Sequence, residues 1–273
     1  MVEECLDSIG TETQPVPLLA TRGLKGRAAI VTGASSGIGR AIALEFAASG
    51  VHVAFNFLDT GSESRLQAQR VANELRQREV RVFSQSCDVR ESGAVERFVE
   101  DAQAELGGVH FLINNAGIGR DRALWRMKNE EWESVLDTNL SGAFYFIRAV
   151  TPHLRAQEWG KIVNIASVHG TRGEFGLSNY ISSKAGLIGL TRSAAVELGP
   201  SNVNVNAVAP GYIRTTQLTE QVPAEILDRA RDKSVLGRLG DPQDVASVVL
   251  FLCSEGARHI TGAVIPIDGG YVL

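Results

Sequence analysis

The sequence is poor in cysteine, in aromatic residues and in long apolar runs. Its 273 residues include 3 cysteines and 6% aromatic residues. Cys5, Cys87 and Cys253 lie too far apart for a disulfide framework or a metal-binding cluster. No apolar run reaches the roughly 18 residues that span a bilayer, so no membrane partner is expected. The acidic N-terminus has no apolar segment typical of a secretory signal, which predicts a cytoplasmic protein.

An excess of basic residues is also absent. Lys and Arg total 27 against 31 Asp and Glu, which gives a formal net charge of −4. Proteins that bind nucleic acid carry a basic stripe, so no nucleic-acid partner is expected. Glycine, in contrast, is abundant, because its 28 residues exceed the usual share of about 7%. The position of these glycines therefore matters for the function.

From residue 24 onward, short apolar strands alternate with amphipathic helices. This alternation is typical of βαβ units, in which helices cover both faces of a parallel sheet. We therefore predict an α/β protein with one domain at 24–273, a Rossmann-like doubly wound parallel sheet with helices on both faces. Strands are expected at 28–31, 51–57, 80–84, 109–113, 161–165, 203–208 and 263–267, and helices at 38–48, 64–78, 94–105, 130–136, 140–157, 178–198 and 242–253.

Two segments depart from this alternation. Residues 1–23 are polar, contain Pro15 and Pro17 and show no periodicity, so we expect a flexible N-terminal extension. Residues 212–238 form a variable stretch before the last expected helix. We expect this second segment to act as a lid over the substrate.

A glycine-rich loop follows the first expected strand. The segment 32–39 reads Thr-Gly-Ala-Ser-Ser-Gly-Ile-Gly, with its glycines spaced G-x3-G-x-G. Glycines at a strand-to-helix turn let the backbone approach a pyrophosphate, which the free N–H groups of the helix then bind. A structural turn without a ligand is the alternative. The loop predicts a dinucleotide site that includes Gly33, Ser35, Ser36, Gly37, Ile38 and Gly39.

The end of the second expected strand bears on which dinucleotide binds. An acidic side chain there would bond the ribose 2′-hydroxyl of NAD(H) and repel the 2′-phosphate of NADP(H). The strand ends with Asn56 and Phe57, neither of them acidic, and Asp59 follows two residues later. Arg40 and Arg65 are candidates to pair with a phosphate. We therefore expect NADP(H), with NAD(H) as the alternative.

A tyrosine and a lysine predict an acid–base site. Tyr180 and Lys184 lie four residues apart in an expected helix, so their side chains fall on one face. A free phenol has a pKa near 10, and a nearby ammonium is expected to lower it. Ser167 closes the strand at 162–166, at the sheet edge where open α/β folds bind ligands. Its hydroxyl can hold a substrate carbonyl.

These motifs resemble those of the short-chain dehydrogenase/reductase family over essentially all of 24–273. The resemblance implies that Tyr180 protonates a carbonyl oxygen as hydride arrives from the nicotinamide. It implies that Lys184 holds the nicotinamide ribose and lowers the Tyr180 pKa, that Ser167 orients the carbonyl, and that Asn139 supports a proton relay. The matching positions are Thr32–Gly39, Asp88-Val89, Asn114–Gly117, Asn139, Ser167, Tyr180, Lys184 and Pro210-Gly211.

The same resemblance implies further contacts with cofactor and substrate. Those at the adenosine half of the cofactor are Asn56, Phe57, Asp88 and Val89. Those along the nicotinamide channel are Asn115, Ala116, Gly117, Pro210, Gly211, Ile213 and Thr215, besides Tyr180 and Lys184. Candidate residues of the substrate pocket are His169, Phe175, Leu177 and Tyr212.

Within this family, three segments are similar to the 3-oxoacyl-(acyl-carrier-protein) reductases of fatty acid biosynthesis. They are 120–132, 183–189 and 260–262. The similarity implies a small carbonyl substrate, a 3-oxoacyl thioester presented on acyl carrier protein, and a homotetramer paired through the helices at 140–157 and 178–198. A short-chain dehydrogenase for another alcohol, a sugar or a steroid is the alternative. A nucleotide-binding protein without turnover is a more remote one.

Two segments depart from that similarity. Reductases of this kind tend to present basic residues before the serine strand and after the tyrosine helix, because acyl carrier protein is acidic. The corresponding segments 156–159 and 199–202 contain no arginine, although Arg155 and Lys161 lie nearby. The loss of such contacts would weaken steering toward an acidic partner.

Overall fold

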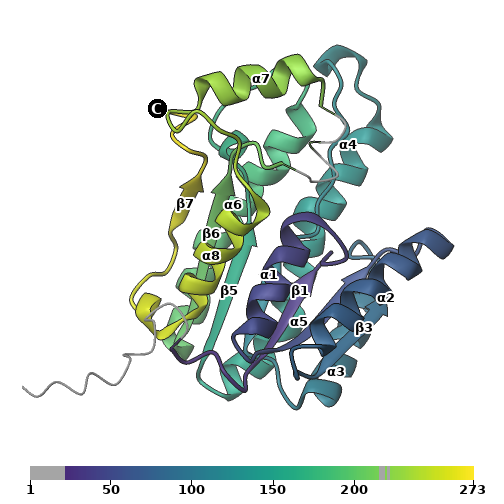
Figure 1. The fold of residues 1–273 in the computed structure, drawn as a ribbon, viewed down its shortest axis with the longest axis vertical. Helices are drawn as coiled ribbons and strands as arrows, with labels where there is room; N and C mark the ends of the chain where they lie inside the picture. Colours follow the sequence, from purple (N-terminus) through teal and green to yellow (C-terminus); the bar gives the residue numbers. More distant parts are fainter. Residues whose placement is uncertain (1–21, 215–218, 220–221) are drawn as a thin grey trace, which may run out of the picture.

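A parallel sheet of seven strands forms the centre of the computed structural model, which describes residues 22–214, 219 and 222–273. The strand order is β3-β2-β1-β4-β5-β6-β7, with helices on both faces (Figure 1). The predicted fold class is thereby confirmed. The strands are β1 (Ala28–Thr32), β2 (His52–Phe57), β3 (Val82–Ser86), β4 (Phe111–Asn114), β5 (Gly160–Ile165), β6 (Val203–Pro210) and β7 (Val264–Ile267).

Eight α-helices are present in the described part of the chain, and six of them pack on the two faces of the sheet. Buried residues of α1, α2 and α8 form one core cluster, and those of α3, α5 and α6 form the other. The helices are α1 (Gly37–Ala48), α2 (Ser62–Arg76), α3 (Ser92–Leu106), α4 (Asn129–Leu136), α5 (Gly142–Ala156), α6 (Ser178–Leu198), α7 (Ala224–Lys233) and α8 (Pro242–Cys253).

The strand residues alternate between the two cores. In β1, Ala29 and Val31 belong to the cluster of α1, α2 and α8, whereas Ala28 and Ile30 belong to that of α3, α5 and α6. All five residues of β1 are buried, as expected for a central parallel strand covered on both faces. Such a sheet holds the carboxyl ends of β1, β4, β5 and β6 side by side at one edge.

The structure corrects some of the predicted boundaries. β3 begins at Val82 rather than at residue 80, because its ladder with β2 starts at the pair Val53–Val82. The expected helix at 140–157 begins at Gly142, after a π-helical turn over Asp137–Ser141. The variable stretch 212–238 contains α7, which was not predicted.

Several predictions concern residues outside the described part of the chain. Nearly all of the expected N-terminal extension, residues 1–21, lies there, as do 215–218 and 220–221 of the expected lid. In the part that is described, no helix is both long and apolar enough to cross a bilayer. The same described residues contain no group of three or more His, Cys, Asp or Glu side chains arranged to hold a metal ion.

Candidate active site

The glycine-rich loop connects β1 to α1 in a shape that leaves helix N–H groups available. Gly33 and Gly37 adopt positive φ angles of 65° and 55°, which favour glycine. Ser36 is the N-cap residue of α1, and its side chain makes no capping hydrogen bond. The first N–H groups of α1 are therefore not satisfied by that side chain, and the helix N-terminus attracts an anion such as a pyrophosphate.

Close packing explains why the third glycine of the loop has no side chain. A Cβ on Gly39 would overlap the Asn115 side-chain amide and would lie 2.8 Å from the carbonyl oxygen of Gly33. The Asn115 amide Nδ2 donates hydrogen bonds to the carbonyl oxygens of Thr32 and Gly33, at 2.8 and 3.2 Å. Asn115, from the loop after β4, thus holds the glycine loop in place from the side.

Thr32, the first residue of the glycine motif, has a structural role that the motif alone does not predict. Its hydroxyl Oγ1 accepts hydrogen bonds from the backbone N–H groups of Asn115 and Ala116, both at 2.9 Å. These bonds tie the loop after β4 to the end of β1. The signal available in the sequence was its place as the first residue of the glycine motif.

At the end of β2, the structure turns the side chain of Asn56 inward. Its Oδ1 accepts a hydrogen bond from the Gly33 N–H at 3.2 Å, and its Nδ2 donates one to the Cys87 carbonyl at 2.8 Å. Asn56 is 2% exposed, so it shapes the glycine loop from within. Phe57, the last residue of β2, is partly buried against the core.

The charged candidates near this end of β2 are engaged in ion pairs. The Asp59 carboxylate accepts two hydrogen bonds from Arg65, and these bonds hold the pKa of Asp59 below its usual value. Arg40 is paired with Glu74 at 2.6 Å. The carboxylate of Asp59 is therefore paired with an arginine in the first turn of α2.

Asp88 and Val89 lie after β3, close to the same sheet edge. The Asp88 carboxylate is bound by Arg90 at 2.6 Å, and this interaction lowers the pKa of Asp88. Val89 is buried, and a Cβ on Gly142 of α5 would contact its side chain at 2.9 Å. The contact with Gly142 places Val89 beside the start of α5.

The structure brings together Ser167, Tyr180 and Lys184, the three residues of the predicted acid–base site. Ser167 follows β5 and is buried, and Tyr180 and Lys184 lie one turn apart on α6. The Ser167 side chain lies close enough to the Tyr180 phenol to lower its pKa. The Lys184 ammonium Nζ donates a hydrogen bond to the Ile165 carbonyl at 2.8 Å and lies 5.7 Å from the centre of the Tyr180 ring.

The electrostatics of this trio differ from the expectation that Lys184 lowers the pKa of Tyr180. Desolvation raises the pKa of Tyr180 to about 12, and the nearby Ser167 side chain offsets this only in part. Burial also lowers the pKa of Lys184 to about 8. At neutral pH the phenol therefore retains its proton, and the ammonium is charged but close to its titration point.

Asn139 lies at the π-helical turn between α4 and α5. Its Oδ1 accepts a hydrogen bond from the Ile118 N–H at 2.8 Å, and its Nδ2 donates one to the Ser183 hydroxyl at 3.0 Å. Turns of this kind are frequent at functional sites because they displace one residue from the regular helix. A Cβ on Gly117 would lie 3.3 Å from Asn139 Oδ1 and 3.4 Å from Lys184 Nζ, so both polar groups converge at Gly117.

The residues after β6 complete the same edge of the sheet. Pro210 ends β6, and a Cβ on Gly211 would lie 2.9 Å from the Asp268 side chain. Ile213 is buried and forms an isolated β-bridge with Gly240. Thr215 lies outside the described residues.

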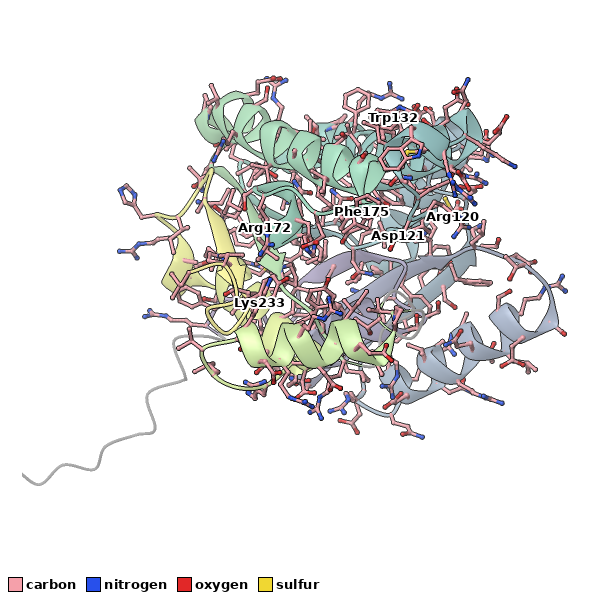
Figure 2. All side chains as sticks on the ribbon, turned by 90° about the horizontal axis from the view of Figure 1, so that it is seen from above. Arg120, Asp121, Trp132, Arg172, Phe175 and Lys233 are labelled. Carbon is pink, nitrogen blue, oxygen red and sulfur yellow. The ribbon has the colours of Figure 1, made fainter. Side chains whose placement is uncertain are left out.

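The four candidate residues of the substrate pocket have different environments. His169 is 7% exposed, and its ring contacts that of Tyr212 edge to face at 5.7 Å. Leu177 is the N-cap residue of α6 and is partly buried. Phe175 is 76% exposed and contacts only the ring edge of Trp125 among the described aromatic side chains. Figure 2 labels Phe175 together with Asp121, Arg172 and Lys233 in the view from above.

The two segments that lack the expected arginines lie side by side. Asn202 Nδ2 donates a hydrogen bond to the Glu158 carbonyl at 3.2 Å. Both residues are exposed, so this surface carries a carboxylate and an amide. A reductase that binds acyl carrier protein was expected to carry basic side chains in these two segments.

A family comparison agrees with this geometry. Residues 33–272 match the family described as enoyl-(acyl carrier protein) reductase. The chain belongs to the short-chain dehydrogenase/reductase family, whose members are oxidoreductases that use a nicotinamide cofactor.

Individual proteins of this family are similar to most of the chain. The 3-oxoacyl-[acyl-carrier-protein] reductase FabG of Staphylococcus epidermidis is 41% identical over 247 residues, which cover 90% of this chain and 99% of the relative. The FabG of Aquifex aeolicus is 42% identical over 90% of this chain and 98% of its own length. A solved structure of a putative short-chain alcohol dehydrogenase from Sinorhizobium meliloti superposes with a TM-score of 0.85 at 35% identity, covering 91% of this chain and 97% of the other.

Proposed function

We propose that the protein is an NADPH-dependent ketoreductase that reduces the 3-oxo group of an acyl thioester to a hydroxyl group. The observation that carries the proposal is the arrangement of Ser167, Tyr180 and Lys184 at the carboxyl edge of the sheet, beside a glycine loop that fits a pyrophosphate. The similarity to 3-oxoacyl-[acyl-carrier-protein] reductases over 90% of the chain supports the substrate class.

The residues of the site have distinct roles in this proposal. A bound nicotinamide supplies hydride to the carbonyl carbon. Ser167 donates a hydrogen bond to the ketone oxygen, and Tyr180 transfers its phenolic proton to that oxygen. Lys184 stabilises the negative charge that develops on the phenolate, and Asn139, which Ile118 and Ser183 hold in position, supports the relay that returns a proton to the phenolate.

The choice of NADPH follows from the residues after β2. No acidic side chain stands at the end of this strand, and the nearest one, Asp59, is paired with Arg65. A free carboxylate that would repel a 2′-phosphate is therefore lacking in the described part of β2, and two arginines, Arg40 and Arg65, flank the region.

Two further parts of the proposal concern partners. The acyl thioester is presented on acyl carrier protein, which in this protein docks without arginines at Glu158 and Asn202. The chain assembles as a homotetramer through α5 and α6, which expose the apolar side chains of Phe144 and Val196. Apolar side chains exposed on paired helices favour association between subunits.

A substrate comparison tests the proposed function. With NADPH in excess, the protein is expected to oxidise the cofactor on addition of a 3-oxoacyl thioester, at a kcat/KM at least about 10-fold higher than with a sugar or a steroid ketone. NADH is expected to give at least about 10-fold lower kcat/KM, because the end of β2 offers no free carboxylate to bond the ribose 2′-hydroxyl of NADH. Cofactor absorbance measures both. Tight NADPH binding without oxidation by any carbonyl would overturn the proposal.

The pH dependence of the reaction provides a second test. Lys184 is cationic below its pKa of about 8, so we expect kcat/KM for reduction to fall as the pH rises through this value. Because the pKa of Tyr180 is about 12, its titration is not expected to change kcat/KM below pH 10. The profile is measured from pH 6 to 10 with a 3-oxoacyl thioester.

The variant Lys184→Arg tests whether titration of Lys184 causes the fall of kcat/KM near pH 8. A guanidinium stays charged to above pH 12, so the limb near pH 8 is expected to disappear, at a lower overall rate. A wild-type profile that is flat from pH 6 to 10, or a limb that persists in the variant, would remove Lys184 from this role.

A further inference from the structure

His169 carries a buried nitrogen for which the protein supplies no partner. The side chain is 7% exposed, and its Nε2 has no hydrogen-bond partner among the described residues. Buried polar atoms are nearly always hydrogen-bonded, so an exception calls for a functional explanation. The proposed reaction assigns no role to this nitrogen.

The position of His169 links it to the reacting carbonyl. The residue lies in the short 3-10 helix Val168–Gly170, directly after Ser167. Its backbone N–H donates a hydrogen bond to the Ser167 hydroxyl oxygen at 3.2 Å. One short turn of backbone therefore connects the imidazole to the Ser167 hydroxyl, the group that would hold the ketone.

Neighbouring groups hold the imidazole in place without satisfying Nε2. The Tyr212 ring contacts it at 5.7 Å with the ring planes at 88°. Tyr212 contacts Tyr271 in the same way at 5.6 Å, and both tyrosines pack against the cluster of Val168, Ala209 and Ala230. Because β5 and β6 are adjacent, His169 after β5 and Tyr212 after β6 meet at the sheet edge that also carries Ser167.

Burial favours the neutral form of the imidazole. Burial lowers the pKa of His169, and the two charged neighbours Glu174 and Arg172 act on it in opposite directions. These two side chains also pair with each other at 3.2 Å. A neutral imidazole carries one N–H donor, which a substrate carbonyl can accept.

We propose that the His169 imidazole donates a hydrogen bond from Nε2 to the second carbonyl oxygen of a 1,3-dicarbonyl substrate, the C1 carbonyl of a 3-oxoacyl thioester or ester. This inference rests on the proposed function. In such a substrate one carbon separates the two carbonyls, so a ketone held by Ser167 and Tyr180 brings the C1 oxygen close to the residue that follows Ser167 by two positions. His169 thereby selects 3-oxo esters over ketones with a single carbonyl.

The selection arises from a hydrogen bond that only the dicarbonyl substrate can form. When a ketone without a second carbonyl binds, Nε2 stays without a partner, as in the free protein, so this ketone gains nothing from His169. His169 does not touch the reacting carbon in this proposal. It is a specificity-determining and positioning residue.

Three variants and two substrates test this role. The substrates are ethyl acetoacetate, which has two carbonyls, and trans-1-decalone, which has one. His169→Phe keeps a ring against Tyr212 but has no donor, whereas His169→Gln keeps an N–H donor. His259→Phe is the matched control. His259 is exposed and lies in the loop before β7, at the edge of the sheet opposite to the site.

We expect His169→Phe to raise KM for ethyl acetoacetate about 10-fold and to change kcat/KM for decalone by less than about twofold. His169→Gln is expected to recover most of the preference for the ester, and His259→Phe to leave both substrates unchanged. Should the phenylalanine variant fail to fold, as judged by thermal unfolding, His169→Leu takes its place with the same expectation.

The possible failures are distinguishable. An equal loss with both substrates in His169→Phe, or no loss with either, overturns the role of His169 while leaving the proposed function intact. Absence of wild-type turnover with ethyl acetoacetate and with acetoacetyl thioester overturns the proposed function, and the role of His169 falls with it.

Discussion

Replacement of Tyr180 by phenylalanine is expected to lower kcat for ketone reduction about 1000-fold, within the range that proton transfer by a positioned side chain contributes. The phenol is the proton donor of the proposed reaction, and its pKa of about 12 keeps the proton in place until the carbonyl oxygen gains charge. The ring remains in the variant, so the Kd for NADPH is expected to change by less than about threefold. Steady-state kinetics and cofactor fluorescence measure the two quantities.

Tyr145→Phe is the matched control for this prediction. Tyr145 lies on α5, outside the site, and loses the same hydroxyl group. Wild-type kcat in Tyr145→Phe together with a large loss in Tyr180→Phe assigns the effect to the site. If Tyr180→Phe retains activity within about 10-fold of wild type, the proton comes from another group and the proposed mechanism is wrong.

Gly39→Ala is expected to weaken NADPH binding about 10- to 100-fold, as overpacking of a close contact costs about 1–3 kcal/mol. A methyl group there would overlap the Asn115 amide and approach the Gly33 carbonyl oxygen to 2.8 Å. Relief of the overlap moves the glycine loop or breaks the hydrogen bonds of Asn115, and either change displaces the N–H groups at the start of α1. Titration of cofactor fluorescence gives the Kd.

The control for this variant is Gly93→Ala in the first turn of α3. A Cβ on Gly93 would meet only the Arg97 guanidinium at 3.5 Å, an ordinary contact. Gly93→Ala is therefore expected to bind NADPH as wild type does. Unchanged NADPH affinity in Gly39→Ala would show that the glycine loop does not approach the cofactor closely.

Much of the fold was predictable because it depends on local patterns. The bounds predicted for α6 and α8 agree with the structure, because Gly199 and Pro200 follow the end of α6, and Asp241 and Pro242 mark the start of α8. The start of β3 was misplaced by two residues, because Val80 is apolar and buried although it precedes the ladder with β2. Strand pairing depends on a neighbour distant in sequence, which no local pattern specifies.

The proximity of Ser167, Tyr180 and Lys184 was predictable from the sequence, but the electrostatics of this trio were not. Helical spacing placed Tyr180 and Lys184 on one face, and strand order placed Ser167 at the same edge. The raised pKa of Tyr180 depends on how completely the surroundings exclude water, and the unpartnered Nε2 of His169 depends on what the neighbouring loops leave unbonded. Both are properties of the assembled tertiary structure.

Because α7 buries little of its surface, the stability of the fold depends little on the sequence of this helix. Ala230 is the buried residue of this ten-residue helix, whereas α1 and α8 each bury several residues against the sheet. Sequence changes on α7 therefore cost little folding free energy, because few of its side chains are removed from water. If α7 belongs to the proposed lid, its sequence can change while the sheet and Tyr180 stay the same, so a new substrate range need not be acquired at the expense of a stable protein.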